Sequence, residues 1–465
     1  MTTTFTAKFE PFAKKMQGGS PIFTENFAYY YQQLLDGHTG LIPEAELLPV
    51  ENLPDAEQLP ASLKGVGEGV LHKTAVIKLN GGLGTSMGLE QAKSLLIVKD
   101  NLSFLDIIAH QAQQMGVPIL LMNSFATDED TRAALQPYAN MAPRPPATFV
   151  QNKEPKIQQN DLSPAKWPPN PELEWCPPGH GDLYASLVIS GILDDLLAAG
   201  YEYAFVSNSD NLGAIVDAQI LGFFAENQLP FMMEVADRTE MDKKGGHLAQ
   251  RSADGQLTLR ESAQCPPEDE IYFQDITRHK YFNTNNLWLN LPALKQLMVR
   301  QDNKLGLPLI RNNKTVDPRD ADSTPVFQLE TAMGSAISVF AGAQAIRVPR
   351  TRFAPVKKTN DLLVVRSDAY SLTEAYRVVP NPEHVNGRLL VELDSDHYKF
   401  VSDLEARFPH GLPSLLNCTH LSVQGDVIFG KNITLQGHVE IINDSGEQAY
   451  LPAGAVLTGT HHISR

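Results

Sequence analysis

The chain has 465 residues, a formal net charge of −16 and three cysteines, Cys176, Cys265 and Cys418. This length exceeds one ordinary hydrophobic core, so we expect two or three domains. The acidic balance without basic clusters argues against nucleic-acid binding. No apolar run has the length of a membrane span or the character of a secretion signal, and an odd number of dispersed cysteines fits a reducing compartment. We therefore expect a soluble, cytoplasmic protein.

The N-terminal part, residues 1–64, is expected to pack on a main domain. Phe27, Tyr30, Tyr31, Leu34 and Leu35 recur at helical spacing and Gly37 is a stop signal, which predicts a helix from residue 21 to about residue 36 with its aromatic side chains in a core. Residues 38–64 lack a clear period and are typical of a connector.

Residues 75–93 form the most informative stretch, AVIKLNGGLGTSMGLEQAK. The apolar run predicts a strand, and four glycines within eight residues predict a loop whose main-chain amides can approach a phosphate or a base, with Lys93 beyond them. The spacing does not match a P-loop, and Met87 stands where the dinucleotide fingerprint has its third glycine. An ordinary strand-to-helix turn would explain one or two of these glycines but not four.

Strands and helices then alternate, which predicts an α/β domain with a mixed, mostly parallel sheet and ligands at the carboxyl ends of its strands. Helix 101–115 is followed by apolar runs at 117–123, 147–150 and 203–206. Asp210 follows the last of these strands directly, which is a usual place for a carboxylate that holds Mg²⁺. In isolation, Asn208 and Asp210 would be better explained as a turn and a helix N-cap. Here the third consecutive strand that ends in a polar loop favours the metal site.

Two further glycine- or asparagine-rich stretches have binding character. His180 lies between glycines at the start of a helix predicted from Leu183 to Ala199, with Asp182 as its cap, and a helix N-terminus favours an anion. Residues 281–291, YFNTNNLWLNL, contain four asparagines, whose amides can bind sugar hydroxyls or form turns. Gly245 and Gly246 permit close approach of a ligand.

Residues 326–340 place Leu329, Met333, Ile337 and Phe340 at helical spacing, so we predict a helix there. A group of basic residues then interrupts the acidic chain. Such a run is usually a solvated face. Against anionic substrates, one of its lysines could supply a second cation. The group comprises Arg347, Arg350, Arg352, Lys357 and Lys358.

From Leu421 the chain falls into four hexads, LSVQGD, VIFGKN, ITLQGH and VEIIND. Apolar residues recur at the first and third positions, which is the period of a β-helix that stacks short strands with these side chains inward. We expect this unit to occupy residues 386–465 and residues 65–385 to form the catalytic domain. Because a short β-helix cannot close its own ends, it should pack on the main domain or on another subunit as a homo-oligomer.

Together, LNGGLGTSMG, FVQNK, PPGHGD, NSDNLGA, KGGHLA, FNTNNLW, QLETAMGSAI and PVKKTNDLL resemble the UTP–glucose-1-phosphate uridylyltransferases of the eukaryotic type, also called UDP-glucose pyrophosphorylases. The resemblance runs from Leu79 to Leu363 and extends to the hexad tail. It implies a Rossmann-like nucleotidyltransferase domain with a C-terminal left-handed β-helix. It also implies the reversible, Mg²⁺-dependent reaction of UTP with glucose 1-phosphate.

The resemblance also implies roles for individual residues. Lys93, Lys357 and Asp210 would be catalytic, and Asp210 would also bind the metal. The nucleotide would be held by Leu79, Asn80, Gly81, Gly82, Lys93, Gln151, Gly179, Asn208, Asp210 and Lys357. The sugar phosphate would contact His180, Asn208, Ser209, Gly246, Asn285, Asn286 and Glu330. One departure is that the family's loop reads MGCxGPKS where this chain has MGLEQAKS, so the path of residues 89–92 is expected to differ.

Two alternatives remain open at the level of the sequence. A pyrophosphorylase for UDP-N-acetylhexosamine or for a broad range of UDP-sugars would use the same chemistry on another sugar. A catalytically inactive nucleotide-binding scaffold would belong to a different class, and the joint presence of Lys93, Asp210 and Lys357 argues against it.

Overall fold

The computed structural model describes residues 3–144, 146–384 and 389–463. Its centre is a ten-stranded mixed sheet, whose main path runs β1-β12-β14-β10-β2-β5-β6 and whose further strands β11, β13 and β17 pair beside it. Seven strands run in one direction, and β1, β13 and β14 run in the other. The expectation of a mixed, mostly parallel sheet is thus confirmed. The strands are β1 Leu47–Leu48, β2 Thr74–Asn80, β5 Ile119–Asn123, β6 Ala147–Val150, β10 Tyr203–Asn208, β11 Phe231–Asp237, β12 His247–Arg251, β13 Leu257–Arg260, β14 Tyr281–Asn290 and β17 Gln344–Arg347.

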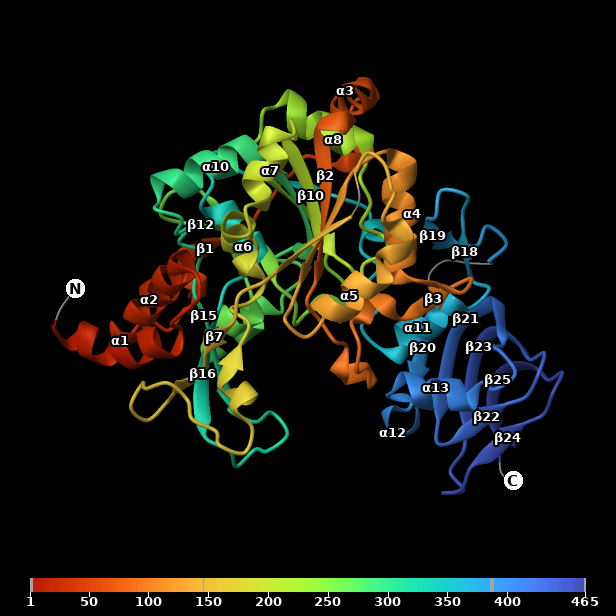
Figure 1. Cartoon of the computed structure of the whole chain (residues 1–465). Helices are drawn as coiled ribbons and strands as arrows, with labels where there is room; N and C mark the ends of the chain where they lie inside the picture. Colours follow the sequence, from red (N-terminus) through yellow and green to blue (C-terminus); the bar gives the residue numbers. More distant parts are fainter. Residues whose placement is uncertain (1–2, 145, 385–388, 464–465) are drawn as a thin grey trace.

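Helices cover both faces of this sheet (Figure 1). Successive side chains of β2 point to opposite faces, so Val76 joins one hydrophobic cluster while Ala75 and Ile77 join the other. The first cluster contains α4 Phe104–Met115, α8 Ala218–Glu226 and α11 Thr359–Arg366, and the second contains α6 Leu183–Ile189, α7 Ile192–Ala198 and α10 Leu291–Arg300. The result is a three-layer α/β/α arrangement with the fully buried β2 at its centre.

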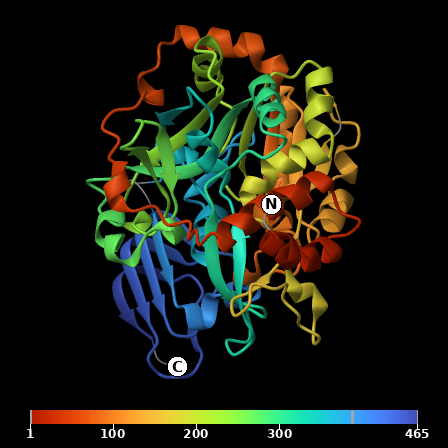
Figure 2. The same cartoon turned by 90° about the vertical axis from the view of Figure 1, so that its left-hand side faces the viewer.

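The N-terminal segment forms two helices, α1 Thr3–Lys15 and α2 Pro21–Leu35, and the predicted helix is confirmed by α2. They share an aromatic cluster in which Phe12, Phe27 and Tyr31 are buried. Figure 2 shows this pair lying across the side of the molecule, above a projecting arm. The arm is a three-stranded sheet of β8 Ile157–Gln158, β15 Ile310–Thr315 and β16 Pro325–Glu330.

The predicted helix at 326–340 is wrong. The first part of this segment is β16, which pairs with β15 and β8, and a 3₁₀ helix follows at Met333–Ser338. The apolar residues that suggested the helix are buried as expected. Their backbone is engaged elsewhere, because Thr331 accepts a bond from the Gly181 amide and donates one to the Pro178 carbonyl. Backbone hydrogen bonds to other segments of the same chain therefore take the place of the local helical bonds.

The predicted helix from Leu183 to Ala199 is also wrong in its continuity. It is divided into α6 and α7 at Gly191, whose φ of +77° is incompatible with a helix interior. Asp182 does not cap α6 through its side chain. Its carboxylate instead accepts bonds from the Asn152 amide groups and the Ser186 hydroxyl.

The C-terminal unit stacks its strands in parallel, as a β-helix does. It contains β20 Leu390–Leu393, β21 Ser414–Gln424, β22 Val427–Phe429, β23 Thr434–Ile442, β24 Ala449–Leu451 and β25 Val456–His462, with α12 Ser395–Tyr398 and α13 Val401–Arg407. Leu421 pairs with Val439, which is 439 − 421 = 18 residues or three hexads later. All eight apolar hexad positions are buried. The hexad period is thus confirmed, and the left-handed sense of the coil stays a prediction.

The C-terminal unit shares its core with the central domain. Leu389, Val391 and Tyr398 belong to the same hydrophobic cluster as α4 and α11. The Thr359 hydroxyl donates to the Tyr398 carbonyl at 2.6 Å, which ties α11 to this unit. The boundary expected between residues 385 and 386 lies outside the described residues.

Helices α3 Ser62–Val70 and α8 pack without side chains between them. A Cβ on Gly67 would lie 1.7 Å from the Ala218 carbonyl oxygen, and one on Gly222 would lie 1.9 Å from that of Leu63. Glycine at these two positions is what allows the two backbones to approach so closely.

We predict that Gly67→Ala forces the two helices apart and lowers the free energy of unfolding by about 3 kcal/mol, since the obstacle is backbone. Gly69, on the same helix, has open space around its Cα. The matched Gly69→Ala should be neutral or stabilise by up to about 1 kcal/mol. Urea unfolding of the two variants checks this, and equal stabilities would contradict the close packing.

Candidate active site

The glycine-rich loop leaves β2 at the carboxyl edge of the sheet and folds back on itself. Gly84 and Gly88 have φ values of +70° and +74°, in the left-handed region that other residues rarely adopt. The Lys93 amide donates to the Gly82 carbonyl at 3.0 Å, which closes the loop. The lysine side chain is thereby returned to the end of the strand that the chain had just left.

Two predicted nucleotide residues lie against each other at this loop. A Cβ on Gly81 would be 2.9 Å from Nε2 of Gln151, so the glutamine side chain rests directly over the glycine. Asn80 has a different place. Its side-chain amide is buried below the loop and donates to Asn123 Oδ1 at 2.8 Å and Thr131 Oγ1 at 2.9 Å. Asn80 therefore supports the loop with its side chain.

Lys93, Lys357 and Asp210, predicted from three distant motifs, meet in the structure. Asp210 Oδ2 accepts bonds from Lys93 Nζ at 2.8 Å and from Lys357 Nζ at 3.1 Å. Lys93 also donates to the Val356 carbonyl. Of the five basic residues in the 347–358 run, the structure brings Lys357 to this carboxylate, whereas the three arginines pair with other acids: Arg347 with Asp55, Glu57 and Asp237, Arg350 with Asp242, and Arg352 with Glu234.

Asp210 is ionised and has an unused oxygen. Burial opposes its ionisation, but the ammonium groups of Lys357 and Lys93 outweigh this and lower the pKa of the carboxyl below its ordinary value. Its Oδ1 is buried and has no hydrogen-bond partner among the residues that the structure describes. A buried, unpaired carboxylate oxygen fits a hard cation such as Mg²⁺. Within the described residues no three His, Cys, Asp or Glu side chains form a metal cage, so substrate phosphates and water would have to complete the coordination.

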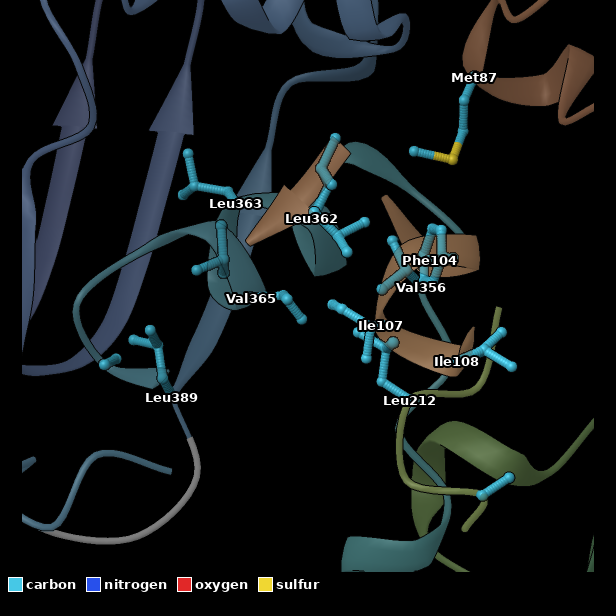
Figure 3. Packing of buried hydrophobic residues seen from close by; sticks show 14 of the residues in the cluster. Met87, Phe104, Ile107, Ile108, Leu212, Val356, Leu362, Leu363, Val365 and Leu389 are labelled. Atoms are coloured by element: carbon cyan, nitrogen blue, oxygen red, sulfur yellow. The ribbon is translucent and has the colours of Figure 1, made fainter. Parts of the chain in front are cut away.

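Apolar side chains anchor the three segments that meet here. Met87 of the glycine loop, Leu212 beside Asp210 and Val356 beside Lys357 belong to one buried cluster. Figure 3 shows them with α4 and α11 side chains such as Ile107 and Leu362. The charged groups therefore project from backbones that are fixed by hydrophobic packing.

His180 is held as a neutral donor. Its Nδ1 accepts a bond from the Met333 amide at 2.9 Å, so in the neutral ring the proton is on Nε2. Burial, and then the positive charge of Lys357, lower its pKa to about 4. The turn that carries His180 packs tightly on Thr331, because a Cβ on Gly179 would lie 2.6 Å from the Thr331 carbonyl oxygen. This contact positions the two neighbouring motifs relative to each other.

The asparagines of residues 283–286 differ in burial: Asn285 is half-buried, whereas Asn283 and Asn286 are buried. A β-bulge interrupts β14 at 283–286, and Asn285 there has a φ of +57° and is half-buried. Bulges often re-aim a side chain beside an active site. Asn286 is fully buried and donates to Glu234 Oε2 at 3.0 Å. Asn285 Oδ1 accepts from Asn283 Nδ2 at 3.0 Å, which leaves the Asn285 Nδ2 group for a ligand, whereas Asn286 supports the framework.

The remaining sugar-phosphate candidates are distributed around these elements. Asn208 is half-buried at the end of β10, and Ser209 is buried, with its amide donating to the Leu79 carbonyl at 3.1 Å. Gly246 lies against the Glu261 carboxylate, whose Oε2 would be 2.4 Å from an added Cβ. The sequence analysis missed Glu261 because a lone glutamate between strand and loop carries no motif.

Glu330 lies behind the His180 turn. With Glu154 and Asp182 it lines a cavity between α2 and α6. Burial raises its pKa, and a hydrogen bond from Asn312 opposes this. Glu330 also packs against Gly179, since its Cβ would lie 3.0 Å from a Cβ added there, so it supports the turn.

Lys78 is a second residue that the sequence analysis missed, because it stands inside an apolar strand pattern. Its buried Nζ donates to Ser207 Oγ at 2.7 Å and to the Ala214 carbonyl at 2.8 Å. It thus joins both ends of the segment 207–214 that carries Asp210. Burial and the nearby Arg352 lower the pKa of Lys78 to about 7, against the opposing charges of Glu234 and Asp210.

From the lowered pKa of Lys78 we predict how the free energy of unfolding depends on pH. Between pH 7 and about 10, the unfolded lysine binds a proton that the folded one lacks, so the protein should gain stability relative to Lys78→Met as the pH rises, by at most about 1.4 kcal/mol per pH unit. Urea unfolding of both proteins at pH 7, 8 and 9 checks this. Parallel stability curves would show that the lysine keeps its ordinary pKa.

Comparison with known proteins agrees with this geometry. Residues 23–436 match the sequence family described as UTP–glucose-1-phosphate uridylyltransferase. The enzyme of that name from Solanum tuberosum is 42% identical over 88% of this chain and 84% of its own. A probable UTP–glucose-1-phosphate uridylyltransferase from Schizosaccharomyces pombe is 41% identical over 84% of this chain and 78% of its own.

Solved structures of similar proteins have the same fold as this chain. A mutant UDP-glucose pyrophosphorylase from Leishmania major superimposes with a TM-score of 0.91 at 43% identity, covering 99% of this chain and 100% of that chain. Another mutant of that enzyme, in complex with UDP-glucose, gives a TM-score of 0.89 at 42% identity over 98% of this chain and 99% of that one. The segments that build the site described above lie within the matched range, and this chain belongs to the UTP–glucose-1-phosphate uridylyltransferase family.

Proposed function

We propose that the protein transfers a uridylyl group reversibly between UTP and glucose 1-phosphate, giving UDP-glucose and pyrophosphate. The observation that carries the proposal is that Lys93, at the end of the glycine-rich loop, and Lys357 both form ion pairs with Asp210. Two cations and a potential metal ligand at the carboxyl ends of β2 and β10 suit a reaction between two phosphate-bearing substrates.

UTP would enter along the glycine-rich loop. The main chain from Leu79 to Gly82 would hold the nucleotide, with Gln151 and Gly179 on the uracil. Gln151 suits this role because it lies over Gly81 and its amide offers both a donor and an acceptor. Lys93, returned to the loop by the bond to Gly82, would move from Asp210 to the phosphates.

The sugar phosphate would bind on the other side of Asp210, between the His180 turn and the Asn285 bulge. Neutral His180 would donate from Nε2 without adding charge. Gly246, Asn208 and Ser209 would complete the contacts, while Asn286 and Glu330 would act through the framework that each supports.

The reaction needs no general base. Glucose 1-phosphate is already mostly a dianion at neutral pH, since the second pKa of a phosphate monoester is about 6. One of its oxygens attacks the α-phosphorus of UTP in line, the bond from that phosphorus to the bridging oxygen breaks, and pyrophosphate leaves with the electron pair. The protein aligns these atoms and neutralises their charge, with Lys93 and Lys357 as the cations.

We further propose Mg²⁺ as the cofactor, with Asp210 as its protein ligand. Mg²⁺ would neutralise phosphate charge at the reacting group. The unpaired, buried Oδ1 of the ionised Asp210 supports this assignment.

Two broader assignments are also proposals. A cytoplasmic location is supported by three cysteines that are all free thiols. Within the described residues, no helix has the length and apolar character needed to cross a membrane. Assembly into a homo-oligomer through a left-handed β-helix is supported by the last coil, where Tyr450 and Val456 are exposed and β25 leaves one edge of its sheet unpaired.

The function is tested by measuring pyrophosphate release from UTP with glucose 1-phosphate or N-acetylglucosamine 1-phosphate, with and without Mg²⁺. We expect turnover with the glucose compound and its loss on chelation of the metal. A preference for N-acetylglucosamine 1-phosphate would overturn the assignment of glucose 1-phosphate as the substrate. Absence of turnover with every sugar phosphate would favour a nucleotide-binding scaffold.

For the lysines, we predict that Lys357→Ala lowers kcat by about 100- to 1,000-fold while equilibrium binding of UTP persists, because a cation acting on the transition state is lost. Lys93→Ala should weaken UTP binding as well as slow turnover. Lys358→Ala, at the exposed neighbouring position, serves as the matched control and should keep wild-type kinetics. Wild-type turnover in Lys357→Ala would refute its catalytic role.

A further inference from the structure

The side chain of Asn211, next to Asp210, uses all of its hydrogen-bonding capacity inside the protein. Its Nδ2 donates to the Arg352 carbonyl at 3.1 Å and to Asn286 Oδ1 at 3.2 Å. Its Oδ1 accepts from the Ala354 amide at 2.9 Å and the Gly213 amide at 3.1 Å. Asn211 is only 2% exposed, so it is shielded from water and from substrates.

Three of these four bonds join segments that are far apart in the sequence, while the bond from Gly213 is local. They connect the segment that carries Asp210, the strand β14 that carries the Asn285 bulge, and the segment 352–355 that leads to Lys357. The backbone adds two further links, an isolated bridge between Asn211 and Pro355 and a bond of 3.1 Å from the Val356 amide to the Asp210 carbonyl. The chain reaches Lys357 only two residues after Pro355.

The partners of Asn211 are themselves fixed. Arg352 forms a buried, two-bond ion pair with Glu234, through Nε at 2.8 Å and Nη2 at 2.6 Å. Glu234 also accepts from Asn286 and from the Trp288 ring nitrogen. Because every member of this network is buried and paired, it has little freedom to shift. Asn211 is the member that connects this framework directly to the backbone of Asp210.

We propose that Asn211 is a positioning residue that sets the distance between the Asp210 carboxylate and the Lys357 ammonium group. The inference rests on the proposed function, since it concerns how that reaction's charged groups are aligned. Asn211 would touch neither substrate. It would act by holding the lysine-bearing segment in register with Asp210, and misplacement of a catalytic group by about 1 Å can cost about 100-fold in rate.

Two substitutions separate this role from simple packing. Asn211→Asp keeps the shape and the oxygen that accepts from the Ala354 and Gly213 amides, but replaces Nδ2 by an oxygen that faces both the Arg352 carbonyl and Asn286 Oδ1. Asn211→Ser is smaller and leaves these partners without a repulsive group. The exposed Asn227, whose side chain bonds only within α8 in the structure as described, gives the matched control Asn227→Asp.

The test is a double-mutant cycle with Lys357. We expect Asn211→Asp and Asn211→Ser to lower kcat by about 10- to 100-fold, with a change of less than about threefold in the dissociation constant of UTP. In the Lys357→Ala background, the same substitutions should lower kcat by less than about threefold, because the group that they misplace is gone. Asn227→Asp should match the wild type. Circular dichroism and UTP binding identify variants that fold, and either Asn211 variant suffices for the cycle.

Each contrary result is distinct. If Lys357→Ala is slow and Asn211 substitutions cost the same factor in both backgrounds, the inference is overturned while the proposed function stands. If Lys357→Ala keeps wild-type turnover, the catalytic role of Lys357 fails and the inference fails with it. Wild-type kcat in both Asn211 variants would overturn the inference alone.

Discussion

The ion pairs of Asp210 with Lys93 and Lys357 are the interaction on which the site depends. A carboxylate with little access to water is costly to ionise unless cations lie beside it. Here the two cations come from positions 117 and 147 residues away in the chain, so the carboxylate draws together the glycine loop and the segment after β17. Both lysines bond to the same oxygen, and the other oxygen has no hydrogen-bond partner among the described residues. The charge balance that phosphate substrates require is thus assembled before they bind.

Holding these charges in place requires a rigid support, which comes in two kinds. Hydrophobic packing fixes the backbone of each segment through Met87, Leu212 and Val356. Hydrogen bonds of buried amides and of the Glu234–Arg352 pair fix the register between segments. Apolar contacts are non-directional and tolerate small shifts, whereas the amide network has defined geometry. Together, the two kinds of contact fix the backbones of the segments that carry Lys93, Asp210 and Lys357.

The C-terminal unit of parallel strands is continuous with this support. Its side chains share a hydrophobic cluster with α4 and α11, and α11 begins two residues after Lys357. Phe400 lies against the glycine-rich loop, because a Cβ on Gly88 would be 2.9 Å from its ring. The unit therefore borders two of the segments that build the site, so its packing bears directly on their positions.

The sequence by itself determined the features that depend on local chemistry. The buried β2 strand, the glycine loop, the helix α2 and the hexad period could all be predicted, because strand burial, backbone freedom and a six-residue repeat are written in neighbouring residues. It also identified Lys93 beyond the glycine loop, Asp210 after a strand and His180 in a glycine-flanked turn, and the family resemblance added Lys357. Only the tertiary structure decided which candidates meet. It brought Lys357 to Asp210 and separated Asn285 from Asn286. It also turned residues 326–330 into a strand, since this segment pairs with β15 and with the distant β8, and Thr331 bonds to the segment 178–181. Lys78, Glu261 and Asn211 escaped the sequence analysis for the same reason: their roles arise from partners that adjoin them only after folding.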